Sequence, residues 1–122
     1  MPFIISRVNV DVSSEQEKKI KTSVGRAIEL VPGKTEEYLM MIFENNSHIW
    51  LRGKNFEPSA YIEMKIFGNE SHHGYNALTA EITKIYNETL NINPNNIYVL
   101  YDDIHTWGVR GFTFERGRFS NE

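Results

Sequence analysis

The chain has 122 residues, enough for one hydrophobic core and too few for two. Hydrophobic residues make up 40% and charged residues 24%, which indicates a folded globular domain and not a disordered chain. The formal net charge of −3 argues against a nucleic-acid partner, which would require a basic surface. Cysteine is absent, which excludes disulfides, zinc–thiolate sites and thiol catalysis.

The pattern of apolar residues indicates no association with a membrane. The longest apolar run, residues 38–43, is too short to span a bilayer. The start of the chain does not resemble a signal peptide, because Arg7, Asn9 and Asp11 interrupt its apolar residues. We therefore expect a soluble cytoplasmic protein, or one that is secreted without a signal peptide.

The chain begins with a predicted strand and a predicted helix. Residues 3–10 are rich in β-branched side chains and follow a proline, which predicts a strand. Ser13 with Gln16, or Ser14 with Glu17, has the spacing of a capping box at the start of a helix. The apolar face of this helix consists of Ile20, Val24, Ala27, Ile28 and Val31.

An unbroken apolar run over residues 38–43 predicts a second strand, buried on both faces. The second half of the chain then repeats the same order. Residues 59–67 and 97–101 are strand-like, and the halves are offset by roughly 57 to 60 residues, which indicates a tandem β-α-β duplication. The helical stripe between these two strands consists of Leu78, Ile82, Ile85, Tyr86 and Thr89.

Shorter segments complete the predicted fold. Residues 48–53 predict a short extra strand between the halves, and residues 107–109 with 112–114 predict a C-terminal ribbon. We expect one domain over residues 1–115 and a flexible polar tail over 116–122. The predicted class is α/β (α+β), with a four-stranded mixed sheet and two helices on one face.

Two helices can cover only one face of such a sheet. The apolar residues of the run 38–43 alternate between both faces, so both need to be buried. A partner subunit would cover the open face, and we expect a homo-oligomer. The alternative is that loops of the same chain cover it.

Two residues could carry chemistry. If Met1 is removed, Pro2 becomes a secondary amine on a buried strand, and burial or a nearby cation lowers the pKa of such an amine. It would then act as a general base at neutral pH. Lys34, just after the first helix, could bind an anion. The simpler alternatives are an ordinary Met-Pro start and a solvated cation at a helix C-terminus.

Other polar residues suggest no cofactor. The four histidines lack the spacing of metal ligands, and no phosphate-binding loop or nucleophile elbow occurs. We therefore expect neither a metal nor a cofactor.

Several short motifs occur in a characteristic order. They are Pro2 to Ile4, Gly33-Lys34, residues 97–103, and the ending over residues 107–114. Together with the doubled β-α-β pattern, the chain resembles the macrophage migration inhibitory factor family of the tautomerase superfamily over about residues 2 to 115. The resemblance implies a homotrimer whose sheets form a central barrel.

The resemblance also implies a site. Pro2 matches the family's catalytic base, and Lys34 matches the lysine that holds a substrate carboxylate. The backbone N–H used on the substrate falls at Phe67, and Tyr98 matches a tyrosine contributed by the neighbouring subunit. The best-known members have an asparagine where this chain has Leu100. The remaining pocket residues are Tyr38 on the rim and Trp107, Val109 and Phe114 in the apolar wall.

The implied function is keto–enol tautomerisation of aryl pyruvates such as phenylpyruvate, a small aromatic keto acid. One alternative is a cytokine-like protein that binds a protein receptor and has little or no activity. Another is an isomerase for an unsaturated diacid, in which Arg52 or Arg110 would supply an extra cation.

Overall fold

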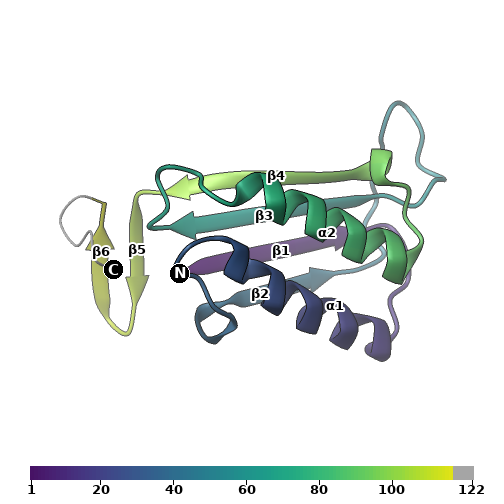
Figure 1. Cartoon of the computed structure of the whole chain (residues 1–122). Helices are drawn as coiled ribbons and strands as arrows, with labels where there is room; N and C mark the ends of the chain where they lie inside the picture. The colour runs from purple at the N-terminus through teal and green to yellow at the C-terminus, as the bar shows by residue number, and fades with distance from the viewer. Residues whose placement is uncertain (117–122) are drawn as a thin grey trace.

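The computed structural model describes residues 1–116, which form a four-stranded sheet, two helices and a small two-stranded sheet (Figure 1). The main sheet has the order β2-β1-β3-β4. Strand β1 is antiparallel to β3, whereas β1 with β2 and β3 with β4 are parallel pairs. This is the predicted mixed sheet of two β-α-β units. Its strands are β1 (Pro2–Val8), β2 (Met40–Glu44), β3 (Ala60–Phe67) and β4 (Ile97–Ile104).

Helices α1 (Ser14–Ala27) and α2 (Tyr75–Leu90) lie side by side on one face of the sheet (Figure 1). The capping box at the start of α1 uses Ser13 and Gln16, the first of the two predicted pairs. Apart from the partly buried Thr89, both predicted helical stripes pack into the core between helices and sheet. Neither helix is long and apolar enough to cross a membrane among the residues described. The fully buried core side chains include Ile20, Val24, Ile28, Leu78, Ile82 and Tyr86.

Two predicted strands differ from those observed. Strand β2 begins at Met40, and Tyr38 lies in a 3-10 turn before it. The expected strand at 48–53 is wrong, because Leu51 forms only an isolated bridge with Lys54. A strand needs a neighbouring strand to pair its backbone groups, and none of the described strands lies beside this segment.

The sheet face opposite the helices is open. Met40 is 63% exposed and Ile42 41% exposed on this face. Leu39, Met41 and Phe43 are partly buried and pack against the core. The expectation that both faces of this strand are buried is therefore not met within one chain.

Charged side chains also cross the open face. Arg7 on β1 pairs with Glu44 on β2, and Lys65 on β3 lies 2.8 Å from Glu63 and 2.9 Å from Asp102 of β4. Hydrogen bonds from Lys65 to these two carboxylates raise the pKa of the lysine. Arg7 also lies 3.8 Å from Glu63 of β3, so these ion pairs link all four strands on the side away from the helices.

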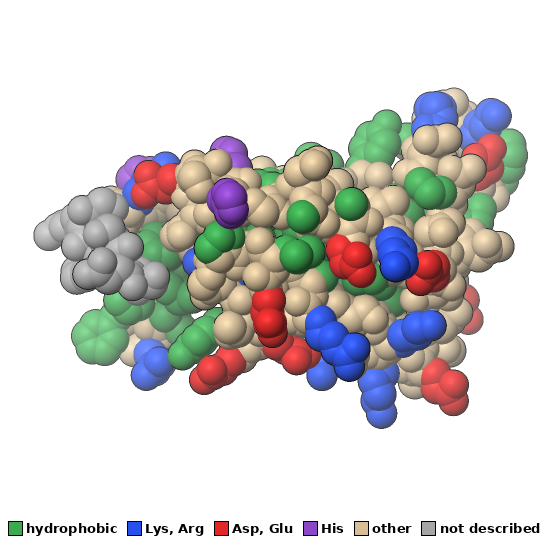
Figure 2. Space-filling view, viewed as in Figure 1, with side chains coloured by type: hydrophobic (Ala, Val, Ile, Leu, Met, Phe, Trp, Pro, Cys, Tyr) green, Lys and Arg blue, Asp and Glu red, His purple; other side chains and the backbone are tan. Residues whose placement is uncertain are grey.

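A hairpin lies beyond the end of the main sheet, at the end where β1 begins (Figure 1). It consists of β5 (Thr106–Val109) and β6 (Phe112–Glu115), and it confirms the predicted ribbon. Arg116 forms ion pairs with Glu70 and Asp103. The rest of the predicted tail, residues 117–122, lies outside the described residues. In Figure 2, hydrophobic side chains gather at the hairpin, whereas charged side chains cover α1.

Candidate active site

A cavity of about 290 Å³ lies where the start of the chain, the segment after α1 and the hairpin meet. Its lining brings together residues far apart in sequence, because β1, the turn after α1 and the hairpin all end at this side of the sheet (Figure 1). The lining residues are Met1, Gly33, Lys34, Tyr38, Val109, Arg110 and Phe114.

Lys34 is the most unusual member of this lining. Its side chain is only 7% exposed, and Nζ donates a 2.8 Å hydrogen bond to the carbonyl oxygen of Phe67. Within residues 1–116, no carboxylate lies at ion-pair distance from it. A buried ammonium group is normally paired with an anion. An anionic ligand in this cavity would provide the partner that a buried ammonium group normally has.

Gly68 makes room for this ammonium group and was not identified from the sequence. A Cβ atom at this position would lie 3.1 Å from Nζ of Lys34. Its φ of 93° is also one that L-residues rarely adopt. The only sequence signal was a glycine directly after a predicted strand, which is not specific for a site.

Pro2 is buried at the start of β1 and pairs with Ile66 of β3. Met1 precedes it, so the nitrogen of Pro2 is an amide in this structure. The N–H of Phe67 donates a 3.2 Å hydrogen bond to the Met1 carbonyl, and the Met1 amino group donates one of 3.4 Å to the Phe67 carbonyl. Met1 thus occupies the Phe67 N–H that the resemblance assigns to the substrate.

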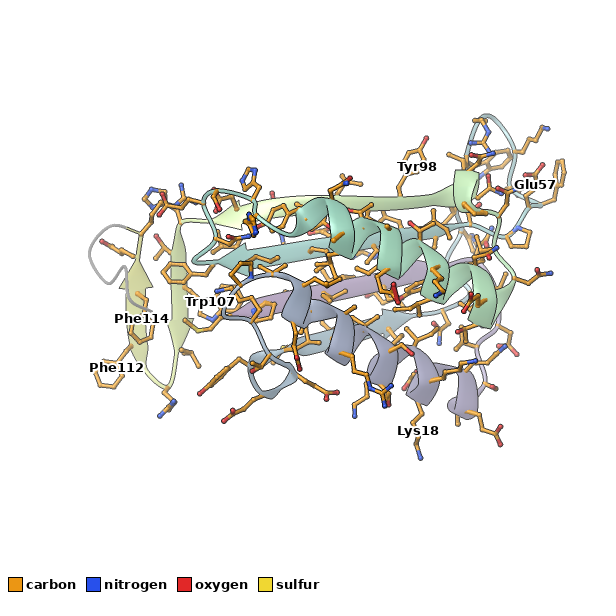
Figure 3. All side chains as sticks on the ribbon, in the orientation of Figure 1. Lys18, Glu57, Tyr98, Trp107, Phe112 and Phe114 are labelled. Atoms are coloured by element: carbon orange, nitrogen blue, oxygen red, sulfur yellow. The ribbon has the colours of Figure 1, made fainter. Side chains whose placement is uncertain are left out.

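The predicted apolar wall is partly assembled. Tyr38, Val109 and Phe114 line the cavity, with Tyr38 at 56% exposed on its rim. Trp107 does not line it, but it lies directly opposite Phe114 in the hairpin (Figure 3). The cavity therefore contains the predicted rim residue Tyr38 and two of the three predicted wall residues, Val109 and Phe114.

Tyr98 and Leu100 lie away from this cavity. Tyr98 pairs with Tyr61 of β3 and Pro2 with Ile66, so their positions differ by five residues along β3, roughly 16 Å. Figure 3 shows Tyr98 at the opposite end of β4 from the hairpin. Tyr98 is 50% and Leu100 44% exposed, and a single chain does not bring them to Lys34.

The two arginines considered for a diacid substrate lie in different places. Arg110 lines the cavity that contains Lys34. Arg52 instead donates a 3.2 Å hydrogen bond to the carbonyl oxygen of Asn95 and another to the side chain of Asn96. The cavity lining therefore contains two cationic side chains and no carboxylate side chain. Over residues 1–116, no three histidine, aspartate or glutamate side chains form a group suited to a metal ion.

Comparisons with known proteins agree with this fold. The sequence model of the family described as macrophage migration inhibitory factor (MIF) matches residues 1–115. A comparison with curated protein sequences finds no match.

Three solved structures illustrate the structural similarity. Leishmania major MIF2 is 24% identical, with a TM-score of 0.85, over 93% of this chain and 97% of that one. The homologue from Prochlorococcus marinus is 23% identical, with a TM-score of 0.80, over 92% and 98%. A fused 4-OT, whose structure is described as an asymmetric trimer, is 19% identical with a TM-score of 0.78, over 91% and 94%.

Proposed function

Because this chain belongs to the macrophage migration inhibitory factor family, we propose that it is a keto–enol tautomerase of aryl pyruvates such as phenylpyruvate. The observation that carries the proposal is the buried Lys34, which lies beside an apolar wall. Its ammonium group has a carbonyl partner, and no carboxylate of the described residues pairs with it. An aryl pyruvate offers a carboxylate for the lysine and a ring for the wall.

The proposed mechanism requires that Met1 is removed. Pro2 then carries a free secondary amine, and the Phe67 N–H loses its bond to the Met1 carbonyl. The neutral amine takes the proton from the carbon next to the oxo group. Lys34 and the freed N–H stabilise the negative charge that develops on the substrate oxygens. Protonated Pro2 then gives its proton to the enolate oxygen, which yields the enol.

We further propose that the site is completed in a homotrimer. Tyr98 and Leu100 lie at the opposite end of the sheet from Lys34, and both are exposed. The open sheet face, with Met40 and Ile42, offers apolar surface to a second copy. A neighbouring subunit would then supply Tyr98 to the cavity. The trimeric relative supports this assembly.

Intact mass spectrometry combined with an enol–keto phenylpyruvate assay tests the proposal. Protein lacking Met1 should turn over phenylpyruvate, and protein that retains Met1 should be nearly inactive, because an amide nitrogen cannot accept the proton. Activity should rise with pH along an acidic limb, since protonated Pro2 cannot act as the base. Insertion of an alanine before Pro2 should abolish turnover. Full activity with Met1 attached would falsify the role of Pro2.

A protein with Met1 removed that shows no turnover would favour the alternative of a cytokine-like binding protein. The same preparation therefore separates the two functions.

A further inference from the structure

The turn that joins β5 and β6 carries an arginine where the backbone favours another residue. Arg110 and Gly111 form the two-residue loop, with φ values of 56° and 82°. Positive φ at both positions is typical of a type I′ turn, in which Asn-Gly is the preferred pair. An arginine with φ above zero is uncommon and is disfavoured by its Cβ. Backbone strain of this kind is characteristic of functional positions.

Arg110 also lines the cavity that holds Lys34. Over residues 1–116, no carboxylate lies at ion-pair distance from either cation. The other side chains of the lining include Tyr38, Val109 and Phe114, which are apolar or aromatic. A lining with two cationic side chains, apolar or aromatic side chains and no carboxylate suits a ligand that carries two negative groups and an apolar part.

We propose that Arg110 binds a second carboxylate on the substrate, so that the cavity prefers 2-oxo acids with an acidic group remote from the oxo group. Lys34 holds the carboxylate beside the oxo group, and Arg110 holds the remote one. The reaction itself rests on the proposed function, whereas the binding of a dianion does not.

A kinetic comparison tests the preference. Protein lacking Met1 is assayed with 4-carboxyphenylpyruvate and with the matched 4-methoxycarbonyl ester, which has a similar size but no remote charge. We expect a KM about fivefold lower for the diacid, the gain of one partly solvated charge-assisted contact. Equal KM values for the two compounds would overturn the proposal.

Variants of Arg110 identify the residue responsible. Arg110→Asn removes the charge and suits the type I′ turn, so the hairpin is retained while the preference disappears. Arg110→Lys should keep part of the preference. Arg26→Gln, which removes the same charge from α1, is the matched control and should leave the preference intact. A preference that survives in Arg110→Asn would contradict the assignment.

A binding measurement separates this proposal from the proposed function. Terephthalate and its monomethyl ester are titrated calorimetrically into the same proteins, which requires no turnover. Tighter binding of terephthalate that is lost in Arg110→Asn supports the dianion site, even if no 2-oxo acid is converted. Turnover of phenylpyruvate without this preference would leave the tautomerase intact and overturn the role of Arg110.

Discussion

Lys34 places a positive charge in the interior with only a carbonyl oxygen as its described partner. Lys34→Ala should impair turnover of phenylpyruvate more than that of its methyl ester, because only the acid presents a carboxylate. A lost charge-assisted bond costs about 1.5 to 3 kcal/mol, or roughly 10- to 150-fold in kcat/KM. Steady-state kinetics with both substrates measures the difference. The control is Lys18→Ala, since Lys18 projects outward from α1 (Figure 3); equal losses for acid and ester would reject the role of Lys34.

The ionisation of Tyr86 makes the free energy of unfolding depend on pH in the alkaline range. Burial raises its pKa to about 12, and its hydroxyl shares a 2.6 Å hydrogen bond with Ser6. An unfolded tyrosine ionises near pH 10. Protonated Tyr86 therefore stabilises the folded state fully below pH 10. This stabilisation is lost as the pH rises to about 12, because the tyrosine of the unfolded chain releases its hydroxyl proton first.

Urea unfolding between pH 9 and pH 11.5 tests this linkage. The free energy of unfolding should fall less steeply with pH in Tyr86→Phe than in the parent, by on the order of 2 kcal/mol over the full range. The variant also loses the bond to Ser6, which lowers stability by about 1 kcal/mol at every pH. Parallel pH curves for the two proteins would show that Tyr86 ionises as easily when folded.

Sequence reasoning identified part of the cavity residue by residue. Lys34, Val109 and Phe114 line one cavity as the resemblance implied, since Lys34 follows the first predicted helix and the other two lie in the predicted ribbon. Arg110 remained one of two candidates, since its turn could not be placed against Lys34 from the sequence. Gly68 was missed because its role depends on the distance between its backbone and the Lys34 ammonium group.

Among the elements, the approach of α2 to the 3-10 turn after α1, which ends at Leu30, depends on Gly74. A Cβ there would lie 2.2 Å from the carbonyl oxygen of Leu30, and its φ is 86°. Gly74→Ala should therefore combine backbone strain with a steric clash and lower the free energy of unfolding by more than 3 kcal/mol.

Gly53→Ala is the matched control for this variant. Its φ is 79°, but nothing lies within 4 Å of the added Cβ. Gly53→Ala should lower the free energy of unfolding only by the cost of the left-handed backbone conformation, about 1 kcal/mol. Chemical denaturation of both variants measures the difference. Similar losses in the two proteins would show that the helix ends separate easily at Gly74.

The elements with a periodic pattern were predicted more accurately than those that depend on partners. The stripe that begins at Ile20 and the stripe on α2 that begins at Leu78 are buried as expected, except for Thr89, which is only partly buried. The segment at 48–53 has the composition of a strand but no strand beside it in the chain. Composition reports only whether a side chain suits a sheet, whereas hydrogen-bonded pairing decides whether the strand forms.

For the whole molecule, the open sheet face predicts assembly. Ile42→Glu places a charge on the apolar part of this face, on the edge strand β2, and it should shift the protein from the proposed trimer towards monomer. Tautomerase activity should fall with the trimer, because Tyr98 would no longer reach the neighbouring cavity. Sedimentation velocity measures both species.

Leu30→Glu is the control for this substitution. Leu30 is 44% exposed, close to the 41% of Ile42, but it follows α1 on the helical side of the sheet. The assembly should tolerate a charge there. A parent protein that sediments as a monomer at micromolar concentration would contradict the trimer directly.

Strand β1 is flanked by β2 and β3, so its first residue emerges in the interior of the sheet and not at its rim. Any peptide attached before Pro2 must leave the molecule through the space between Lys34 and the hairpin. An amino-terminal affinity tag or carrier protein would therefore block the cavity for as long as it remains attached. A host with an efficient methionine aminopeptidase therefore becomes part of the design of any assay.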